Sequence, residues 1–163
     1  PVSMTKKELL QAIIRSLESD LELFTAAART AHEAATHAEC LPDNKYDTTA
    51  LEASYLAQGQ ANRAQDIRMA LEAYRGLILQ AFDDQTPVRL TALVCLEDAD
   101  GTQRSVFLGP RAGGMKVVAG DRDVVVITPG SPLGRRLLGR CVGDELQLDE
   151  RAIASSLLVV AVE

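Results

Sequence analysis

The chain has 163 residues, of which 47% are hydrophobic and 25% charged, and its formal net charge is −6. These values are typical of a soluble globular protein of one or two domains and argue against a large phosphate-binding surface. The apolar runs are far shorter than the roughly 20 residues of a membrane-spanning helix. Three scattered cysteines predict neither a disulfide framework nor a zinc site, and six aromatic residues are too few to stack on single-stranded nucleic acid. We therefore expect a cytoplasmic protein without membrane contact.

The two halves of the chain differ in composition. Residues 1–84 hold two of the 11 glycines and carry 8 basic and 13 acidic side chains. Residues 85–163 hold the other nine glycines and carry 9 basic and 10 acidic side chains. Because glycine marks turns and loops, whereas a long stretch almost without it suits helices, the change predicts two domains, 1–84 and 85–163.

A hydrophobic repeat in residues 1–84 predicts two long helices. Thr5-x-x-Glu8 has the form of a capping box, which opens a helix. The first apolar seam with 4,3 spacing is Leu10, Ile14, Leu17, Leu21, Phe24, Ala28, Ala31, Ala35 and Ala38. After the breaker at Pro42, the second seam is Ala50, Ala53, Ala57, Gln60, Ala64, Ile67, Leu71, Tyr74, Ile78 and Ala81.

The two seams mirror each other around residue 45. The numbers of residues that would face each other, such as Phe24 with Ile67 and Ala38 with Ala53, add to 91. Mirrored registers predict an antiparallel coiled-coil hairpin, about 50 Å long at a rise of about 1.5 Å per residue. Because alanine replaces larger residues toward the turn, we expect the hairpin to project as a rod that narrows toward its tip.

Carboxylates gather around the expected tip of the hairpin, near residues 39–52. They belong to Glu39, Asp43, Asp47 and Glu52. Like charges at close range cost stability, so the cluster favours binding of a cation or of a positively charged surface. The alternative is helix capping, because Asp47 suits an N-cap and Thr49-x-x-Glu52 has the form of a capping box.

The histidines do not predict a metal site. His32 and His37 are five residues apart, whereas the histidines of an H-E-x-x-H motif are four apart and share one helix face. We expect both side chains to be exposed, and we expect no permanently bound metal or other cofactor.

Residues 85–163 predict a small sheet covered by one helix, which makes the whole chain α+β. The expected strands are Val88–Glu97, Arg104–Leu108, Val124–Thr128 and Ser155–Val162, with a hairpin turn at Asp100-Gly101. The expected helix lies within 131–139, where Ser131 suits the N-cap, Pro132 the first turn and Gly139 the position after the end. No set of residues in this half suits catalysis.

One run of this half resembles the signature of a known family. The run is Ser131-Pro132-Leu133-Gly134-Arg135-Arg136-Leu137-Leu138-Gly139-Arg140-Cys141-Val142-Gly143-Asp144. It resembles S-P-[LI]-[GA]-[RK]-x-L-[LI]-G-[KR]-x-x-G-D, the signature of the C-terminal domain of bacterial Gre transcript-cleavage factors. The predicted long hairpin with an acidic tip is similar to the architecture of the same family.

The resemblance implies a function in transcription elongation. In Gre factors an FKBP-like C-terminal domain docks at the rim of the secondary channel of RNA polymerase, and the coiled coil enters that channel. Carboxylates at its tip help to hold a second Mg²⁺ at the polymerase active site, which stimulates hydrolysis of backtracked RNA. The factor contacts nascent RNA and DNA only indirectly and is not itself an enzyme.

The resemblance also implies which residues of this chain act. The tip acids would be Asp43, Asp47 and Glu52. The docking residues would be Ser131, Pro132, Leu133, Arg135 and Arg136. Helix punctuation is the alternative explanation for Ser131 and Pro132, and solvation is the alternative for the basic cluster that Arg135 and Arg136 form with Arg140.

The tip departs from the family's pattern. Members that stimulate cleavage resemble D-[LI]-x-E-N-x-E-Y there, whereas this chain has Asp43, Lys45 and Asp47 and lacks an Asp-x-x-Glu pair. Two functions therefore stay open, stimulation of cleavage or occupation of the channel without it.

Two further alternatives start from the predicted fold. An FKBP-like domain suggests prolyl isomerisation, but such a pocket is lined with aromatic residues and residues 85–163 have only Phe107. The hairpin alternatively serves as a structural dimerisation arm, with Gln60 and the alanine layers on the associating face. We expect a monomer, with a dimer as the alternative.

Overall fold

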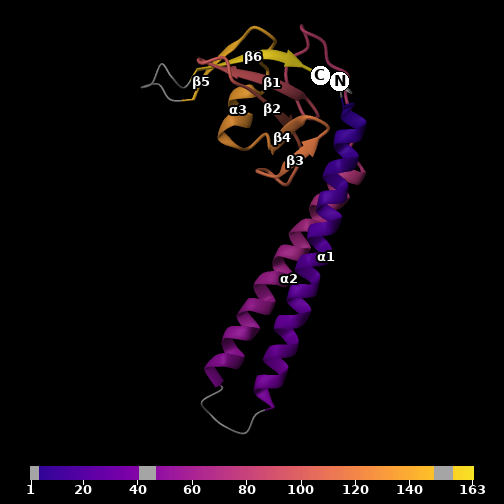
Figure 1. Cartoon of the computed structure of the whole chain (residues 1–163), viewed down its shortest axis with the longest axis vertical. Coiled ribbons are helices and arrows are strands. Elements are labelled where there is room, and N and C mark those ends of the chain that lie inside the picture. The colour runs from indigo at the N-terminus through magenta and orange to yellow at the C-terminus, as the bar shows by residue number, and fades with distance from the viewer. Residues whose placement is uncertain (1–3, 41–46, 149–155) are drawn as a thin grey trace. The chain divides into compact units, whose positions relative to one another are not determined.

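The computed structural model describes residues 4–40, 47–148 and 156–163. Contacts divide the chain into a helical unit, Arg15–Glu72, and a sheet unit, which joins Pro1–Ile14 to Ala73–Glu163 (Figure 1). The units therefore part within the two long helices, whereas the composition change lies near residue 84. None of the described helices combines the length and the apolar character that crossing a bilayer would require.

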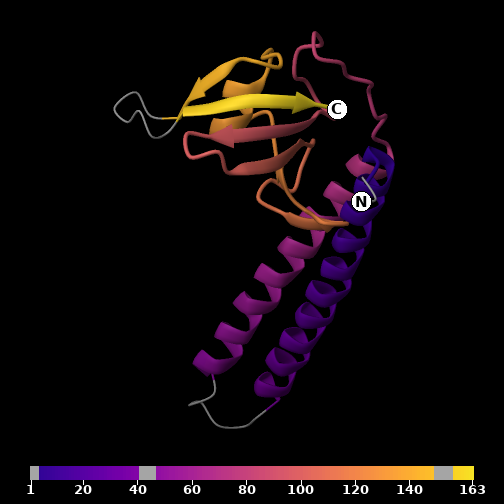
Figure 2. The ribbon, with the colours of Figure 1, turned by 45° about the horizontal axis from the view of Figure 1, so that its top comes forward.

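The helical unit is formed by α1 (Lys6–Glu39) and α2 (Asp47–Arg75), which continue into the sheet unit. The two helices lie side by side in Figures 1 and 2. The guanidinium carbon of Arg63 lies 5.8 Å from the centre of the Phe24 ring, and nearer the turn Glu39 shares a pocket with Ala50. Residue numbers thus fall along α2 as they rise along α1, which confirms the antiparallel hairpin.

The predicted seams agree with the burial of side chains over most of the hairpin. Every seam position from Leu10 to Ala38 and from Ala50 to Tyr74 is buried or half-buried. The last two positions of the second seam were predicted wrongly. The helix ends at Arg75, directly before the helix-breaking Gly76, so that Ile78 is 77% exposed and Ala81 is also exposed.

The start of α1 follows the predicted capping box. The backbone N–H of Thr5 donates to Glu8 Oε2 at 3.0 Å, and the N–H of Glu8 donates to Thr5 Oγ1 at 3.2 Å. In the next position, Lys6 Nζ donates to the carbonyl oxygens of Gln80 at 2.5 Å and Thr91 at 3.0 Å. It also lies 4.5 Å from the centre of the Phe82 ring. Lys6 therefore fastens the first turn of α1 to the segment that leads into the sheet.

Tyr74 fastens the end of α2 within the same unit. Its side chain is fully buried, and its hydroxyl donates to the carbonyl oxygen of Arg111 at 2.6 Å. A Cβ at Gly109 would overlap the Tyr74 hydroxyl and lie 3.2 Å from Val126 Cγ1, so glycine leaves the space that the ring fills. Burial raises the pKa of Tyr74.

The sheet unit contains a mixed sheet of six described strands in the order β3-β4-β2-β1-β6-β5. The strands are β1 (Leu93–Asp98), β2 (Gln103–Leu108), β3 (Lys116–Ala119), β4 (Arg122–Ile127), β5 (Glu145–Gln147) and β6 (Ser156–Val162). Neighbouring strands run antiparallel, except that β2 and β4 are parallel. The predicted hairpin turn joins β1 to β2, and Gly101 adopts the left-handed conformation there, with φ +87°.

Two short strands, β3 and β5, were absent from the sequence-based prediction. The first strand was also expected to begin at Val88, but β1 begins at Leu93, because Val88 exchanges backbone hydrogen bonds with Gly139 and Arg140 instead. Between these positions Thr91 is buried with φ +76°.

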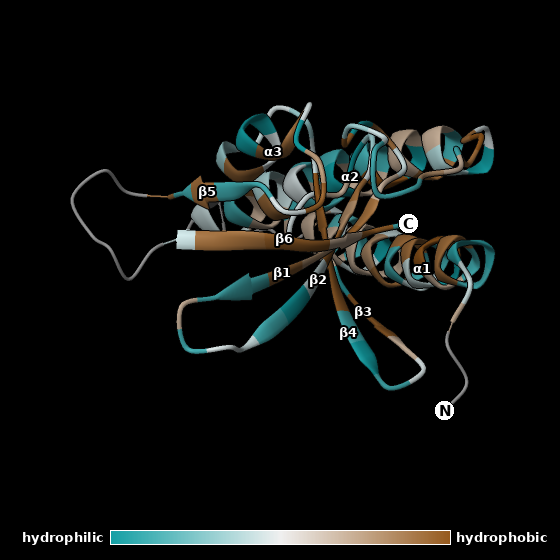
Figure 3. Cartoon of the chain, turned by 90° about the horizontal axis from the view of Figure 1, so that it is seen from above, coloured by the Kyte–Doolittle hydropathy of each residue, from teal (hydrophilic) through white to brown (hydrophobic). Residues whose placement is uncertain are grey.

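The core of the sheet unit lies between the sheet and α3 (Pro132–Leu137). Leu137 is fully buried there, together with Val94 and Leu96 of β1 and Leu157 and Val159 of β6. The last strand, β6, is hydrophobic over most of its length, and the ends of β1 and β2 at their shared turn are hydrophilic (Figure 3). The apolar run near the C-terminus thus forms an interior strand of the sheet, as its composition predicts.

Candidate functional site

The segment that leads into α3 is organised by the hydroxyl of Ser131. Ser131 Oγ accepts the N–H of Gly134 at 3.0 Å and donates to the carbonyl oxygen of Thr128 at 2.7 Å. Pro132 follows in the first turn, where its missing N–H costs nothing. The Ser131 hydroxyl therefore acts as the N-cap and is engaged as donor and as acceptor inside the fold.

Two glycines complete this helix. A Cβ at Gly134 would overlap the carbonyl oxygen of Thr128, so only glycine allows the close approach that the cap requires. Gly139, just after the helix, has φ +81° and donates its N–H to the carbonyl oxygen of Val88 at 2.8 Å. Most residues of the signature thus form the short helix α3, and Gly139 bonds the end of this helix to the segment that precedes β1.

The expected docking residues divide into two kinds. Leu133 is half-buried and packs against the core, and Ser131 is half-buried and is occupied as the cap. Pro132, Arg135 and Arg136 are exposed. The structure therefore leaves these three available to a partner, whereas Ser131 and Leu133 support them.

The three arginines of the basic cluster donate to backbone carbonyl groups. Arg135 Nε donates to Gly130 O at 2.8 Å, and Arg140 Nε donates to Arg136 O at 3.3 Å. Arg136 Nη1 donates to Gln147 O, the last residue of β5. These bonds hold the guanidinium groups against α3 and the end of β5.

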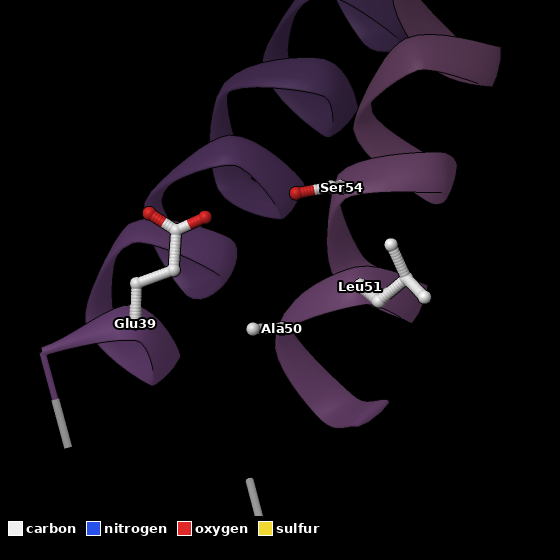
Figure 4. A pocket seen from close by; sticks show the side chains of 4 residues that line it. All are labelled: Glu39, Ala50, Leu51 and Ser54. Atoms are coloured by element: carbon white, nitrogen blue, oxygen red, sulfur yellow. The ribbon is translucent and has the colours of Figure 1, made fainter. Parts of the chain in front are cut away.

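The other expected site lies where α1 ends and α2 begins. A cavity of about 320 Å³ there is lined by Glu39, Ala50, Leu51 and Ser54. In Figure 4 the Ser54 hydroxyl points toward α1, whereas the side chain of Leu51 points away from α1. Glu52 is exposed on α2 and does not line this cavity.

Two of the expected tip acids, Asp43 and Asp47, have side chains outside the described residues. Asp43 and the turn near residue 45 lie outside the described residues. Asp47 is the first residue of α2, and its side chain lies outside them too. Since α2 begins at Asp47, Thr49 and Glu52 lie within the first two turns of the helix.

The described residues hold no group of three or more His, Cys, Asp and Glu side chains that could bind a metal ion. His32 and His37 are exposed, as predicted from their spacing. Cys40, Cys95 and Cys141 are free thiols.

A second cavity, of about 190 Å³, lies on the sheet. It is lined by Leu93, Cys95, Gln103, Ser105, Arg122, Val160, Ala161 and Glu163. Burial raises the pKa of the Cys95 thiol, which donates to Gln103 Oε1 at 3.8 Å. No lining residue is aromatic, which argues against a proline-binding pocket at this place.

The sequence analysis did not predict the exposure of two leucines near α3. Leu138 follows α3 and is 40% exposed, and Leu148 follows β5 and is 37% exposed. Leucine in a short amphipathic helix or beside a strand is usually buried, so no sequence signal distinguishes these two from core residues.

No protein-family model and no curated protein sequence matches the chain. Among solved structures, it is similar to one described as the transcription factor Gfh1, at 25% identity over 93% of this chain and 94% of that chain, with a TM-score of 0.40. It is also similar to the GreA factor homolog 1 (Gfh1) protein of Thermus thermophilus, at 24% identity over 92% and 94% of the two chains, with a TM-score of 0.38. For Thermus aquaticus Gfh1 the identity is 26% over 94% and 95%, with a TM-score of 0.37.

With TM-scores of 0.37 to 0.40, these structures differ from the chain in much of their detail. In the signature that builds α3 and in the order of its helical and sheet elements, the chain is similar to factors of the Gre type.

Proposed function

We propose that the chain is a Gre-like transcription elongation factor that binds bacterial RNA polymerase and inserts the end of its helical hairpin into the secondary channel. The observation that carries this proposal is the antiparallel pairing of α1 and α2, with acidic residues on both sides of their turn. A second support is the Gre-like signature, whose residues form the capped helix α3.

The acidic residues around the turn supply the chemistry that this function needs. Carboxylate oxygens are the ligands that Mg²⁺ prefers, and a second metal ion stabilises the attacking and leaving oxygens of a phosphodiester. Asp43 and Asp47 are the candidates to present such an oxygen, with Glu52 next. The polymerase performs the reaction, and the factor holds no cofactor of its own.

Transcript cleavage by stalled polymerase tests this proposal. Purified elongation complexes are incubated with Mg²⁺ and the wild-type chain, Asp43→Asn or Asp47→Asn, and shortened RNA is measured over time. If the chain donates a metal ligand, wild type accelerates cleavage, and at least one substitution lowers the rate by about tenfold or more, as loss of a metal-positioning group does. Glu22→Gln, an exposed acid in the middle of α1, is the matched control and leaves cleavage unchanged.

Two other outcomes have distinct meanings. If wild type binds the polymerase and slows elongation without cleavage, the chain is a channel-occupying regulator and the metal function is wrong. If immobilised polymerase fails to retain the chain, the whole proposal is wrong.

One observation favours a second candidate, a dimerisation arm. Leu51, Tyr55 and Leu56 of α2 are 54%, 70% and 57% exposed, and such apolar side chains suit contact with another protein. Sedimentation velocity over a wide concentration range tests it. A sedimentation coefficient that does not rise with concentration excludes this candidate.

A further inference from the structure

A groove runs along one side of the helical unit, between α1 and α2. It consists of the cavity of about 320 Å³ described above and a second cavity of about 480 Å³, and Ser54 lines both. All lining residues lie within Arg15–Glu72, so the groove belongs to the helical unit alone. We define the hairpin groove by Arg29, His32 and Glu39 on α1 and Leu51, Ser54 and Ala61 on α2.

The groove leaves part of the coiled-coil seam uncovered. Ala28 and Ala57, which also line it, are only half-buried, whereas the nearby seam residues Ala31 and Ala64 are buried. Long side chains beside the seam of a coiled coil usually cover it, but Ala61 takes such a position on α2 and is too short to do so. The space next to Ala61 is therefore open to another side chain.

The two ends of the groove carry opposite charge. Arg29 and His32 lie at one end, and Glu39 lies at the other, 7 to 10 residues farther along α1. At a rise of about 1.5 Å per residue, the charges are separated by about 10–15 Å along the helix. Arg29 and Glu39 are exposed, and among the described residues the structure shows no ion pair for either of them.

The two ends also differ in shape. Leu51 lies at the same end as Glu39 and is 54% exposed, so a large apolar side chain is available there (Figure 4). At the other end Ala61 leaves the gap beside Arg29 and His32. Each end thus lacks what the opposite end has, both in charge and in size.

A second copy of the chain, turned end for end, satisfies both differences. A twofold axis perpendicular to the helices places α1 against α1 and α2 against α2, each pair antiparallel. Glu39 then lies opposite Arg29 and His32 of the second copy, and Leu51 lies opposite Ala61 of the second copy. The same contacts recur on the other side of the axis, as a twofold interface requires.

We propose that two copies of the chain associate through the hairpin groove as an antiparallel four-helix bundle, with Glu39 of each copy paired with Arg29 and His32 of the other. Carboxylate–guanidinium pairs fix the orientation, and burial of Leu51 supplies apolar contact. The proposal rests on the second candidate function, the dimerisation arm, and names its surface. Of the three exposed apolar side chains that favour that candidate, Leu51 alone lines the groove.

Mixing two charge-reversed variants tests this arrangement. In Arg29→Glu or Glu39→Arg alone, like charges meet at both ends of the interface, so each variant should associate about tenfold more weakly than wild type or worse. In a heterodimer of the two variants, each end again holds one acidic and one basic side chain from different copies. Sedimentation equilibrium should therefore show weak association of each variant alone and association close to that of wild type for the equimolar mixture.

Matched variants outside the groove control for charge and for apolar area. Arg68→Glu and Asp66→Arg change exposed residues of α2 that do not line the groove, and they should associate as wild type does, alone and mixed. Leu51→Ala should weaken association, whereas Leu23→Ala, at a residue of α1 that is 65% exposed, should not. Circular dichroism melting checks that every variant folds.

The possible failures are distinguishable. If wild type associates but the mixture of reversed variants does not recover, the copies meet at another surface, and the hairpin groove is wrong while the dimerisation arm stands. If wild type stays monomeric at every concentration, both are wrong. Neither result changes retention of the chain by immobilised RNA polymerase, which tests the first proposed function separately.

Discussion

Gly134 has no room for a side chain, because a Cβ would overlap Thr128 O and lie 2.9 Å from Ser131 Oγ. In most helices Gly→Ala is stabilising, but here the overlap should reverse the sign. We expect Gly134→Ala to lower the free energy of unfolding by about 1–3 kcal/mol. Urea unfolding followed by circular dichroism measures this change.

The same substitution at Gly59 is the matched control. Gly59 lies in the middle of α2, and nothing lies within 4 Å of a Cβ placed there. Gly59→Ala should therefore raise the free energy of unfolding by about 0.5–1 kcal/mol. If the two substitutions changed the free energy of unfolding in the same direction, the overlap at Gly134 would not explain its effect.

Tyr74 should make stability depend on alkaline pH. Burial raises its pKa in the folded state, so the unfolded chain, with a tyrosine pKa of about 10, loses the proton first as the pH rises. The stabilisation is therefore complete below about pH 10 and decreases above it. Between about pH 9 and about pH 11, wild type should lose more unfolding free energy than Tyr74→Phe does.

Near neutral pH the same substitution tests the hydrogen bond to Arg111 O. Tyr74→Phe should cost about 1 kcal/mol there, because the part-buried carbonyl of Arg111 loses its donor. Tyr55→Phe, at a residue that is 70% exposed, should leave the free energy of unfolding near neutral pH unchanged. Parallel pH profiles of wild type and Tyr74→Phe would show that Tyr74 is not the titrating group.

At the scale of the elements, the alanine layers set how closely α1 and α2 approach. Ala35 is 4% exposed, whereas its neighbour Ala34 is exposed on the same helix. Ala35→Leu should lower the free energy of unfolding by about 1–3 kcal/mol, because added methyl groups force closely packed helices apart. Ala34→Leu should change it by less than about 0.5 kcal/mol, and thermal melts of the two variants make the comparison.

The sequence predicts the hairpin well because each helix follows one period over many turns. The period does not report where a helix ends, so it continues through Ile78 and Ala81, which lie past Gly76. The strands β3 and β5 have four and three residues, too few for alternation to be recognised. They form because β4 and β6 offer free edges to them.

Some features of the candidate site could be predicted from the sequence, and others could not. The cap at Ser131 and the glycine after α3 were predictable, because local hydrogen bonding and backbone conformation decide them. The exposure of Leu138 and Leu148 depends on what the rest of the fold leaves uncovered, and the side chains of Asp43 and Asp47 depend on a turn outside the described residues.

At the scale of the whole molecule, the two compact units carry charge of different sign at their candidate sites. Residues 15–72 carry 5 basic and 10 acidic side chains, whereas residues 124–143, which include α3, carry three arginines and no acidic side chain. One partner that bears both an acidic and a basic surface would engage both units of the same chain. Linked contacts of this kind raise the overall affinity beyond that of either contact alone.

The cap formed by Thr128, Ser131 and Gly134 limits which positions of chains with this fold can change in sequence. The hydrogen bonds and the close approach of these residues shape the start of α3 and do not involve the helical ends that flank the turn between α1 and α2. Selection for folding and selection for activity therefore act on different residues. Duplicated copies can exchange one set of carboxylates for another, and even acquire opposing effects, while still sharing the same recognisable motif.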